Sequence, residues 1–144
     1  MSAVTSIVLP DAQATPVNHY FIPLGPDENQ VWWYEDQSTS TPIGYNRVSI
    51  SLRRPKMAKV SENAGSRTAR VTLTIHTPVL ETIGIADSGT TPPPSIAFVP
   101  KVTCEFVISE RSTSQHRKDL RKYMLSLLAD TQVVNAIENL QGIY

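Results

Sequence analysis

The chain has 144 residues, 40% of them hydrophobic, and its 13 Lys and Arg balance 13 Asp and Glu to a formal net charge of zero. This length predicts one domain over residues 1–144, and the single cysteine excludes an internal disulfide framework or a cysteine-based zinc site. No apolar run approaches the roughly 20 residues of a membrane span, and no signal-peptide pattern opens the chain, so we expect no membrane partner.

The first two-thirds of the chain predict β-strands. Residues 3–9 and 17–24 are rich in β-branched and apolar side chains and are followed by the turn signals Pro10-Asp11 and Gly25-Pro26, so they suggest an N-terminal hairpin. Residues 31–34 follow as a compact aromatic strand.

Three longer segments alternate strictly between apolar and polar side chains: residues 47–53, 68–77 and 101–109. A period of two over this length predicts strands with one buried and one polar face. Two loops separate them, a basic one over residues 55–66 and one over residues 84–95 that contains Asp87-Ser88-Gly89 and Pro92-Pro93-Pro94. Consecutive prolines cannot donate ladder hydrogen bonds, so the second loop should be extended and exposed.

The period changes to a helical one after residue 111. Ser112 and Gln115 fit a capping box, and apolar side chains from Leu120 to Leu128 then recur at helical spacing. Asp130 is expected to end this helix and to cap a second one. The predicted class is α+β: an N-terminal β-hairpin, an antiparallel sheet of about five strands and two C-terminal helices packed on one face.

The zero net charge hides an uneven distribution. Residues 1–44 carry a net charge of −5, whereas residues 45–76 carry +6. This basic block supplies spaced arginines and short hydroxyl side chains to the polar sheet face, where arginine binds phosphates and hydroxyls reach phosphate oxygens or base edges. A flat sheet suits unpaired RNA better than the major groove of DNA. Ordinary solvent exposure of this face is the alternative.

The last strand, residues 101–109, is long and regular and precedes the helices. Such a strand at a sheet edge invites pairing with a second copy of the chain, so we expect a dimer.

The chain as a whole resembles the coat proteins of single-stranded RNA bacteriophages. The resemblance rests on the order and spacing of the predicted elements, and on GYNRVSISLR at residues 44–53, RVTLTIHTP at 70–78 and the terminal GIY at 142–144. It implies an intertwined homodimer that pairs through the last strand. Dimers would build a T=3 icosahedral shell around genomic RNA, in the virion and assembled in the bacterial host cytoplasm. In several relatives the same sheet face represses translation by binding an RNA hairpin.

The resemblance also implies which residues bind RNA. Short hydroxyls at Ser49, Ser51 and Thr72 match those that line an adenine pocket in relatives, whereas Thr74 stands where a lysine is expected and Lys101 where a stacking tyrosine is expected. The full set is the polar side chains of three strands: Arg47, Ser49, Ser51, Arg53, Thr68, Arg70, Thr72, Thr74, His76, Lys101, Thr103 and Glu105.

An enzyme is disfavoured because His19, His76 and His116 fall on separate predicted elements without a carboxylate at metal-ligand spacing. Cys104 alternates onto the apolar face and is expected to be an inert thiol. We therefore expect no catalytic residue, metal or cofactor. A dimeric RNA-binding regulator that forms no shell is the alternative to a coat protein.

Overall fold

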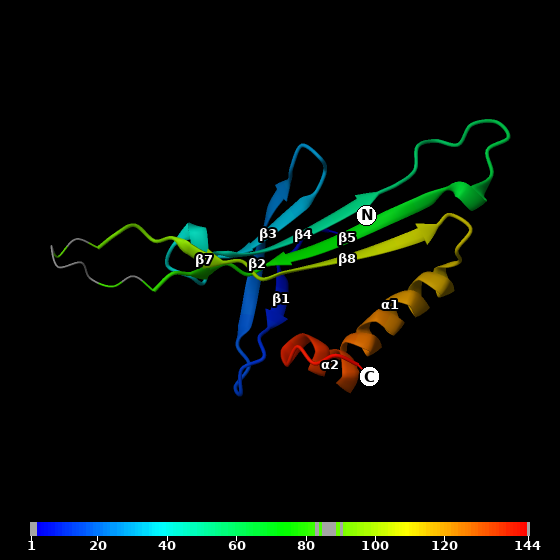
Figure 1. Cartoon of the computed structure of the whole chain (residues 1–144). Helices are drawn as coiled ribbons and strands as arrows, with labels where there is room; N and C mark the ends of the chain where they lie inside the picture. Colours follow the sequence, from blue (N-terminus) through cyan, green and yellow to red (C-terminus); the bar gives the residue numbers. More distant parts are fainter. Residues whose placement is uncertain (1–2, 83, 85–88, 90, 144) are drawn as a thin grey trace. The chain divides into compact units, whose positions relative to one another are not determined.

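The computed structural model describes residues 3–82, 84, 89 and 91–143. Its contacts divide the chain into two compact units, one of residues 1–56 and 69–107 and one of residues 57–68 and 108–144. The first unit contains most of the sheet, and the second contains the helices together with Thr68, Ile108 and Ser109 at the ends of two strands (Figure 1).

Within the described residues, the main sheet has six antiparallel strands in the order β1-β2-β3-β4-β5-β8 (Figure 1). The three alternating strands are confirmed to within one residue at each end. The N-terminal hairpin is also confirmed, although its first strand begins later than expected. The strands are β1 Ile7–Pro10, β2 Asn18–Pro26, β3 Trp32–Asp36, β4 Asn46–Arg53, β5 Thr68–His76 and β8 Lys101–Ser109.

The hairpin is part of the main sheet, because β2 also pairs with β3. The described sheet therefore has six strands where about five were expected. The third strand runs beyond the expected residues 31–34 to Asp36, because Glu35 and Asp36 pair with Arg47 and Asn46 of β4. Alternation in so short an aromatic segment does not reveal these cross-strand partners.

A second, two-stranded ladder joins β6 (Val79–Leu80) to β7 (Ile96–Phe98). The sequence did not predict it, since both strands are very short. The proline-bearing segment leads into β7, and Pro92, Pro93 and Pro94 are exposed as expected. Asp87 and Ser88 of the predicted loop lie outside the described residues.

The core covers one face of the main sheet. Register places Ile7 opposite Phe21, and Tyr34 opposite Val48, which in turn faces Ile75. Phe21, Tyr34 and Val48 are buried, and Leu9, Trp32 and Ile50 pack against them together with Ile7 and Ile75. The same face nevertheless leaves large side chains uncovered in the single chain: Leu52 is 51% exposed and Val102 is 54% exposed.

The described part of the second unit contains the helices α1 (Ser114–Leu128) and α2 (Thr131–Glu138). The expected start of α1 is off by one residue: Thr113, not Ser112, is the N-cap, and its hydroxyl accepts a hydrogen bond from the His116 N–H at 3.2 Å. Ser112 is occupied elsewhere, because its hydroxyl donates to the Ser109 carbonyl at 2.6 Å. Asp130 caps α2 as predicted, accepting from the Gln132 N–H at 2.9 Å.

One buried arginine anchors the long loop of the second unit, which includes the short 3-10 helix η2 (Ala64–Ser66). The Arg67 Nε donates to Glu110 Oε2 at 2.6 Å, and its Nη1 donates to Glu62 Oε2 at 3.0 Å. The Glu110 N–H also donates to the Arg67 carbonyl at 3.0 Å. A buried guanidinium is stable only when its donors are satisfied, so these carboxylates account for its position.

His19 joins the N-terminal hairpin to β3 on the apolar side of the sheet. Its Nδ1 lies 2.7 Å from Asp36 Oδ2, and its Nε2 lies 3.4 Å from Asp11 Oδ2. These bonds raise the pKa of His19, the one to Asp36 contributing most. The pKa of Asp11 is lowered, chiefly by the Val17 N–H, and that of Asp36 is lowered because hydrogen bonds from His19 and Ser38 outweigh its burial.

These shifts predict a pH-dependent contribution to stability. The stabilisation by protonated His19 is complete below its ordinary pKa of about 6.5. This stabilisation is lost as the pH rises through the higher pKa that His19 has in the folded state. The carboxylates of Asp11 and Asp36 stabilise the fold above about pH 3.9. Their stabilisation is lost as the pH falls through their lowered folded-state pKa values. We expect His19→Gln to lower the free energy of unfolding by about 1 kcal/mol at pH 5.5 and by less at pH 9.

Thermal unfolding at fixed protein concentration measures this effect. His116→Gln is the matched control, because glutamine is favoured at the N3 position that His116 occupies and should keep the α1 cap. A loss of stability in His19→Gln that is equal at both pH values would contradict the ionic role of His19.

Candidate nucleic-acid interface

The predicted RNA-binding residues share the polar face of the main sheet. The β4–β5 register places Arg47 opposite His76, Ser49 opposite Thr74, Ser51 opposite Thr72 and Arg53 opposite Arg70, and directly opposed residues lie on the same face. Thr68 alternates with Arg70 and joins this face. The Arg70 guanidinium lies 3.4 Å from the Glu105 carboxylate of β8, so Lys101, Thr103 and Glu105 belong to it as well. We call these residues, with Trp33 and Glu35, the polar face.

Side-chain length divides the polar face into a floor and a rim. Ser49 and Ser51 are only 7% and 8% exposed in the single chain, because they are short and lie in central strands between larger neighbours. The long side chains of Arg47, Arg53 and Arg70 are exposed. Charged groups therefore stand above a floor of small hydroxyls.

The predicted set of RNA-binding residues omits two members of this face, both on β3. Trp33 is paired with Ser49, and Glu35 with Arg47. The Arg47 Nε donates to Glu35 Oε2 at 3.0 Å, and Glu35 is only 7% exposed. The Trp33 ring meets the His76 ring edge-on at a centroid distance of 6.4 Å. Alternation assigns Trp33 and Glu35 to one face once the strand is known to extend to Asp36.

The polar face keeps an excess of positive charge. Four cations, Arg47, Arg53, Arg70 and Lys101, stand against the carboxylates of Glu35 and Glu105. The Arg70–Glu105 pair is solvent-exposed and longer than an ideal ion pair, and such pairs contribute little. Arg70 can therefore exchange this partner for a phosphate at small cost, whereas Arg47 is held by a nearly buried carboxylate.

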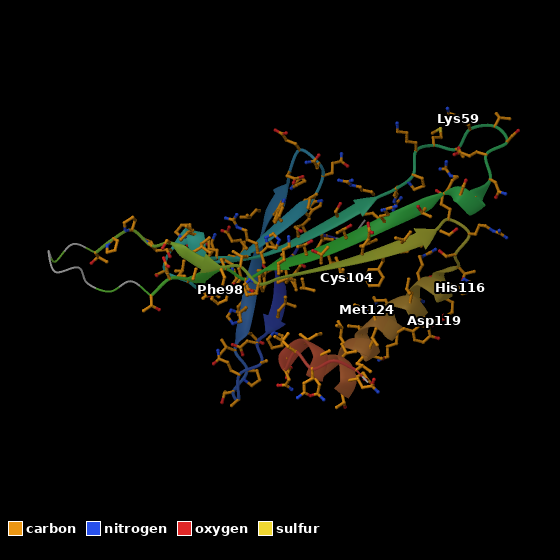
Figure 2. All side chains as sticks on the ribbon, in the orientation of Figure 1. Lys59, Phe98, Cys104, His116, Asp119 and Met124 are labelled. Carbon is orange, nitrogen blue, oxygen red and sulfur yellow. The ribbon has the colours of Figure 1, made fainter. Side chains whose placement is uncertain are left out.

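The three histidines and the cysteine lie on four different elements of the structure. His19 contacts Asp36 and Asp11 on the apolar side of the sheet, His76 contacts Trp33 on the polar face, and His116 takes part in the α1 cap. Cys104 is half-buried on β8, where Figure 2 labels it. Across the residues that the structure describes, no group of three or more His, Cys, Asp or Glu is placed to hold a metal ion.

The helices are short and carry many polar side chains. Figure 2 shows His116, Asp119 and Met124 along α1. Of the helices in the described ranges, none has the length and apolarity needed to cross a membrane.

Comparison with known proteins finds similarity along nearly the whole chain. The model of the levivirus coat protein family matches residues 2–144. The capsid protein of Pseudomonas phage PRR1 is 31% identical over 141 residues, covering 96% of this chain and 97% of that protein. Among solved structures, the chain of the virus-like particle of bacteriophage ESE058 has 42% sequence identity and a TM-score of 0.91. The chain of the virus-like particle of bacteriophage NT-214 has 26% sequence identity and a TM-score of 0.81. Each of these two alignments covers 99% of this chain and 100% of the chain in the solved structure.

The family match spans nearly every residue, and the observed fold agrees with it: an antiparallel sheet followed by two C-terminal helices. The chain belongs to the levivirus coat protein family, and its role is that of a structural protein of the phage capsid, located in the virion.

Proposed function

We propose that the chain dimerises, assembles into a T=3 icosahedral shell in the bacterial host cytoplasm, and binds single-stranded genomic RNA through the polar face. The role is structural and non-enzymatic. The observation that carries the RNA part is the β4–β5 register, which gathers Arg47, Arg53 and Arg70 with the short hydroxyls on one face.

The RNA proposal is supported by the geometry of this face. Phosphates need mobile cations above the surface, and bases need a flat surface with small hydrogen-bonding groups between the cations. The exposed arginines supply the first requirement, and Ser51, Thr72 and Thr74 supply the second. The same combination favours binding of a hairpin loop, so translational repression through an RNA hairpin is a second candidate function.

The shell proposal is supported by apolar side chains that the single chain does not cover. On the helices, Tyr123 is 70% exposed, Leu127 is 55% exposed and Ile137 is 60% exposed, and α1 and α2 contain no buried residue. Burying a large aliphatic or aromatic side chain contributes about 1.5–3 kcal/mol. Such a surface is expected on a subunit that associates with copies of itself, and the 42% identical relative was solved as a virus-like particle.

The dimer is supported by the position of β8, which is the terminal strand of the described sheet. The Thr77 N–H donates to the Pro100 carbonyl, and the Glu110 N–H donates to the Arg67 carbonyl, each at 3.0 Å. Because backbone groups alternate in direction along a strand, even-numbered residues of β8 bond toward β5 and odd-numbered ones toward the outer edge. The N–H of Thr103 therefore points to where a second copy would pair.

Expressing the full chain alone and imaging the product by electron microscopy tests the proposed function. We expect uniform spheres, and nuclease-protected RNA should be extracted from them. Soluble dimers that bind RNA without forming spheres would contradict the coat function and support the regulator alternative. Empty spheres would contradict the RNA part.

Substitution of cations on the polar face should weaken RNA binding uniformly. Arg53, Arg70 and Lys101 are changed together to Gln, and Arg47 is spared because its loss would leave the buried Glu35 without its partner. Each lost phosphate contact lowers the salt slope of single-strand binding by about 0.7, so the slope should fall by about 2. Binding of an unstructured RNA at several salt concentrations measures it.

The control changes Lys118, Arg121 and Lys122 to Gln, which removes equal charge from exposed positions on α1. An equal loss of slope in both triple variants would show that net charge, and not the polar face, determines RNA binding.

Proline at the outer edge of β8 should block dimer formation. Thr103→Pro removes an N–H that points away from β5, and edge strands tolerate such a proline, so the monomer should keep its sheet. We expect sedimentation to show monomers and circular dichroism to retain the strand signal. Thr103→Val, which keeps the N–H, is the control and should dimerise. A dimeric Thr103→Pro would rule out pairing through this N–H.

A further inference from the structure

The N-terminal hairpin carries an exposed apolar patch on the side opposite its core. Phe21 is buried, so its neighbours in β2, Tyr20 and Ile22, point to the other side, and the register places Val8 opposite Tyr20. Leu24 follows at the β-bulge between residues 23 and 25. These four side chains, which we call the hairpin patch, are 45% to 58% exposed in the single chain: Val8, Tyr20, Ile22 and Leu24.

The hairpin patch lacks a partner in the single chain. A strand with apolar side chains on both sides is typical of one that is covered on both faces. One side of the hairpin packs on the core, whereas the other side lies in solvent. Ile22 is opposite Glu35 of the polar face, yet the patch itself contains no charged side chain. It therefore fits an apolar protein surface better than it fits phosphates.

A second exposed apolar patch lies on the arm that β6 and β7 form (Figure 1). Val79 and Phe98 are directly opposed in this short ladder and are 39% and 60% exposed. Val99 follows and is 45% exposed. Figure 2 labels Phe98 at this place. We call these three residues the arm patch.

Several contacts hold the arm in place. The Glu81 N–H donates to the Ser95 carbonyl at 2.9 Å, and the Ser95 hydroxyl donates to the Glu81 carboxylate at 2.6 Å. Leu80 packs closely on Gly44 of the short 3-10 helix η1 (Pro42–Gly44), where an added Cβ would lie 3.0 Å from Leu80 Cδ1. The arm therefore presents its patch as part of a built surface and not from an unsupported loop.

A shell of dimers needs a second kind of contact. Pairing through β8 is a two-fold contact that two copies satisfy completely, whereas rings of copies need a contact between two different surfaces. β1 and β8 end the described sheet on opposite sides, so pairing through β8 leaves the hairpin edge free. The hairpin patch and the arm patch are two different apolar surfaces of the first unit, and they project from the sheet in different directions (Figure 1).

We propose that the hairpin patch of one copy docks on the arm patch of a copy in a neighbouring dimer. The inference rests on the proposed shell and names one contact between dimers within it. Docking would bring Tyr20 against Phe98, and aromatic side chains are enriched in the buried centres of protein interfaces.

Removing either aromatic ring should weaken assembly without weakening the dimer. Tyr20→Thr and Phe98→Thr place a strand-forming residue at positions exposed in the single chain, so both variants should fold and dimerise normally. We expect the protein concentration needed for shells, measured by light scattering, to rise at least about tenfold. Val60→Thr is the matched control, because Val60 is 99% exposed outside both patches, and it should assemble normally. An equal rise in Val60→Thr would overturn the assignment.

Introduced cysteines test which surfaces meet. Tyr20→Cys and Phe98→Cys are combined with Cys104→Ala, which removes the natural thiol. Because each copy would offer its two surfaces to different neighbours, oxidised shells should give covalent chains of three or more copies in a denaturing gel. Either introduced cysteine alone should give none. If the double-cysteine variant does not assemble alone, co-assembly with an equal amount of the Cys104→Ala chain supplies shells for the same measurement.

The outcomes separate this contact from the shell itself. Shells that contain both cysteines but stay uncross-linked would overturn the contact and leave the coat function intact. Cross-linked pairs with Tyr20→Cys alone would also overturn it, because hairpin patches would then meet each other. Weaker RNA binding by dissociated Tyr20→Thr dimers, together with normal assembly, would assign the hairpin patch to RNA instead. Failure of the unaltered chain to form shells would overturn both proposals.

Discussion

The register between β4 and β5 is the constraint on which the rest of the polar face depends. Side chains alternate with a period of two, so a one-residue slip of β4 would turn Arg47 and Arg53 to the apolar side and expose Val48. Burial of Val48 and packing of Ile75 against it resist such a slip. The hydrophobic core on one face therefore determines which charges gather on the other.

Carboxylates on the polar face act on individual cations in different ways. Glu35 is nearly buried and holds Arg47 in one orientation, whereas Glu105 is exposed and contacts Arg70 only weakly. Removing Glu35 would release the Arg47 guanidinium, but it would also leave Arg47 without its ion-pair partner in the central strands. The polar face thus contains one cation held by a nearly buried carboxylate and other, exposed cations along the strands. Under the proposed function, this arrangement suits positioning of RNA at Arg47 and adaptable phosphate binding elsewhere.

The single chain is incomplete as a packing unit. Its core contains few fully covered side chains, and large apolar residues such as Leu52 on the sheet and Tyr123 on α1 remain exposed. In the described sheet β8 is the terminal strand, and in the proposed dimer its outer backbone groups and the apolar surface would be satisfied by the same event, association with a second copy. In the proposed dimer, association therefore adds to the stability that the fold of the single chain already has.

Alternation along the sequence determined the long strands and which of their side chains share a face, because that periodicity is a local property of the extended backbone. The residue types near Asp130 also predicted that this residue ends one helix and caps the next. The tertiary structure decided the rest: Glu35 became a member of the polar face through its pairing with Arg47, and Thr113 replaced Ser112 as the α1 cap because Ser112 bonds to Ser109. A hollow of about 300 Å³ beside Arg47 and His76 is lined by segments as far apart as residues 42 and 99, and no local pattern specifies how such segments meet.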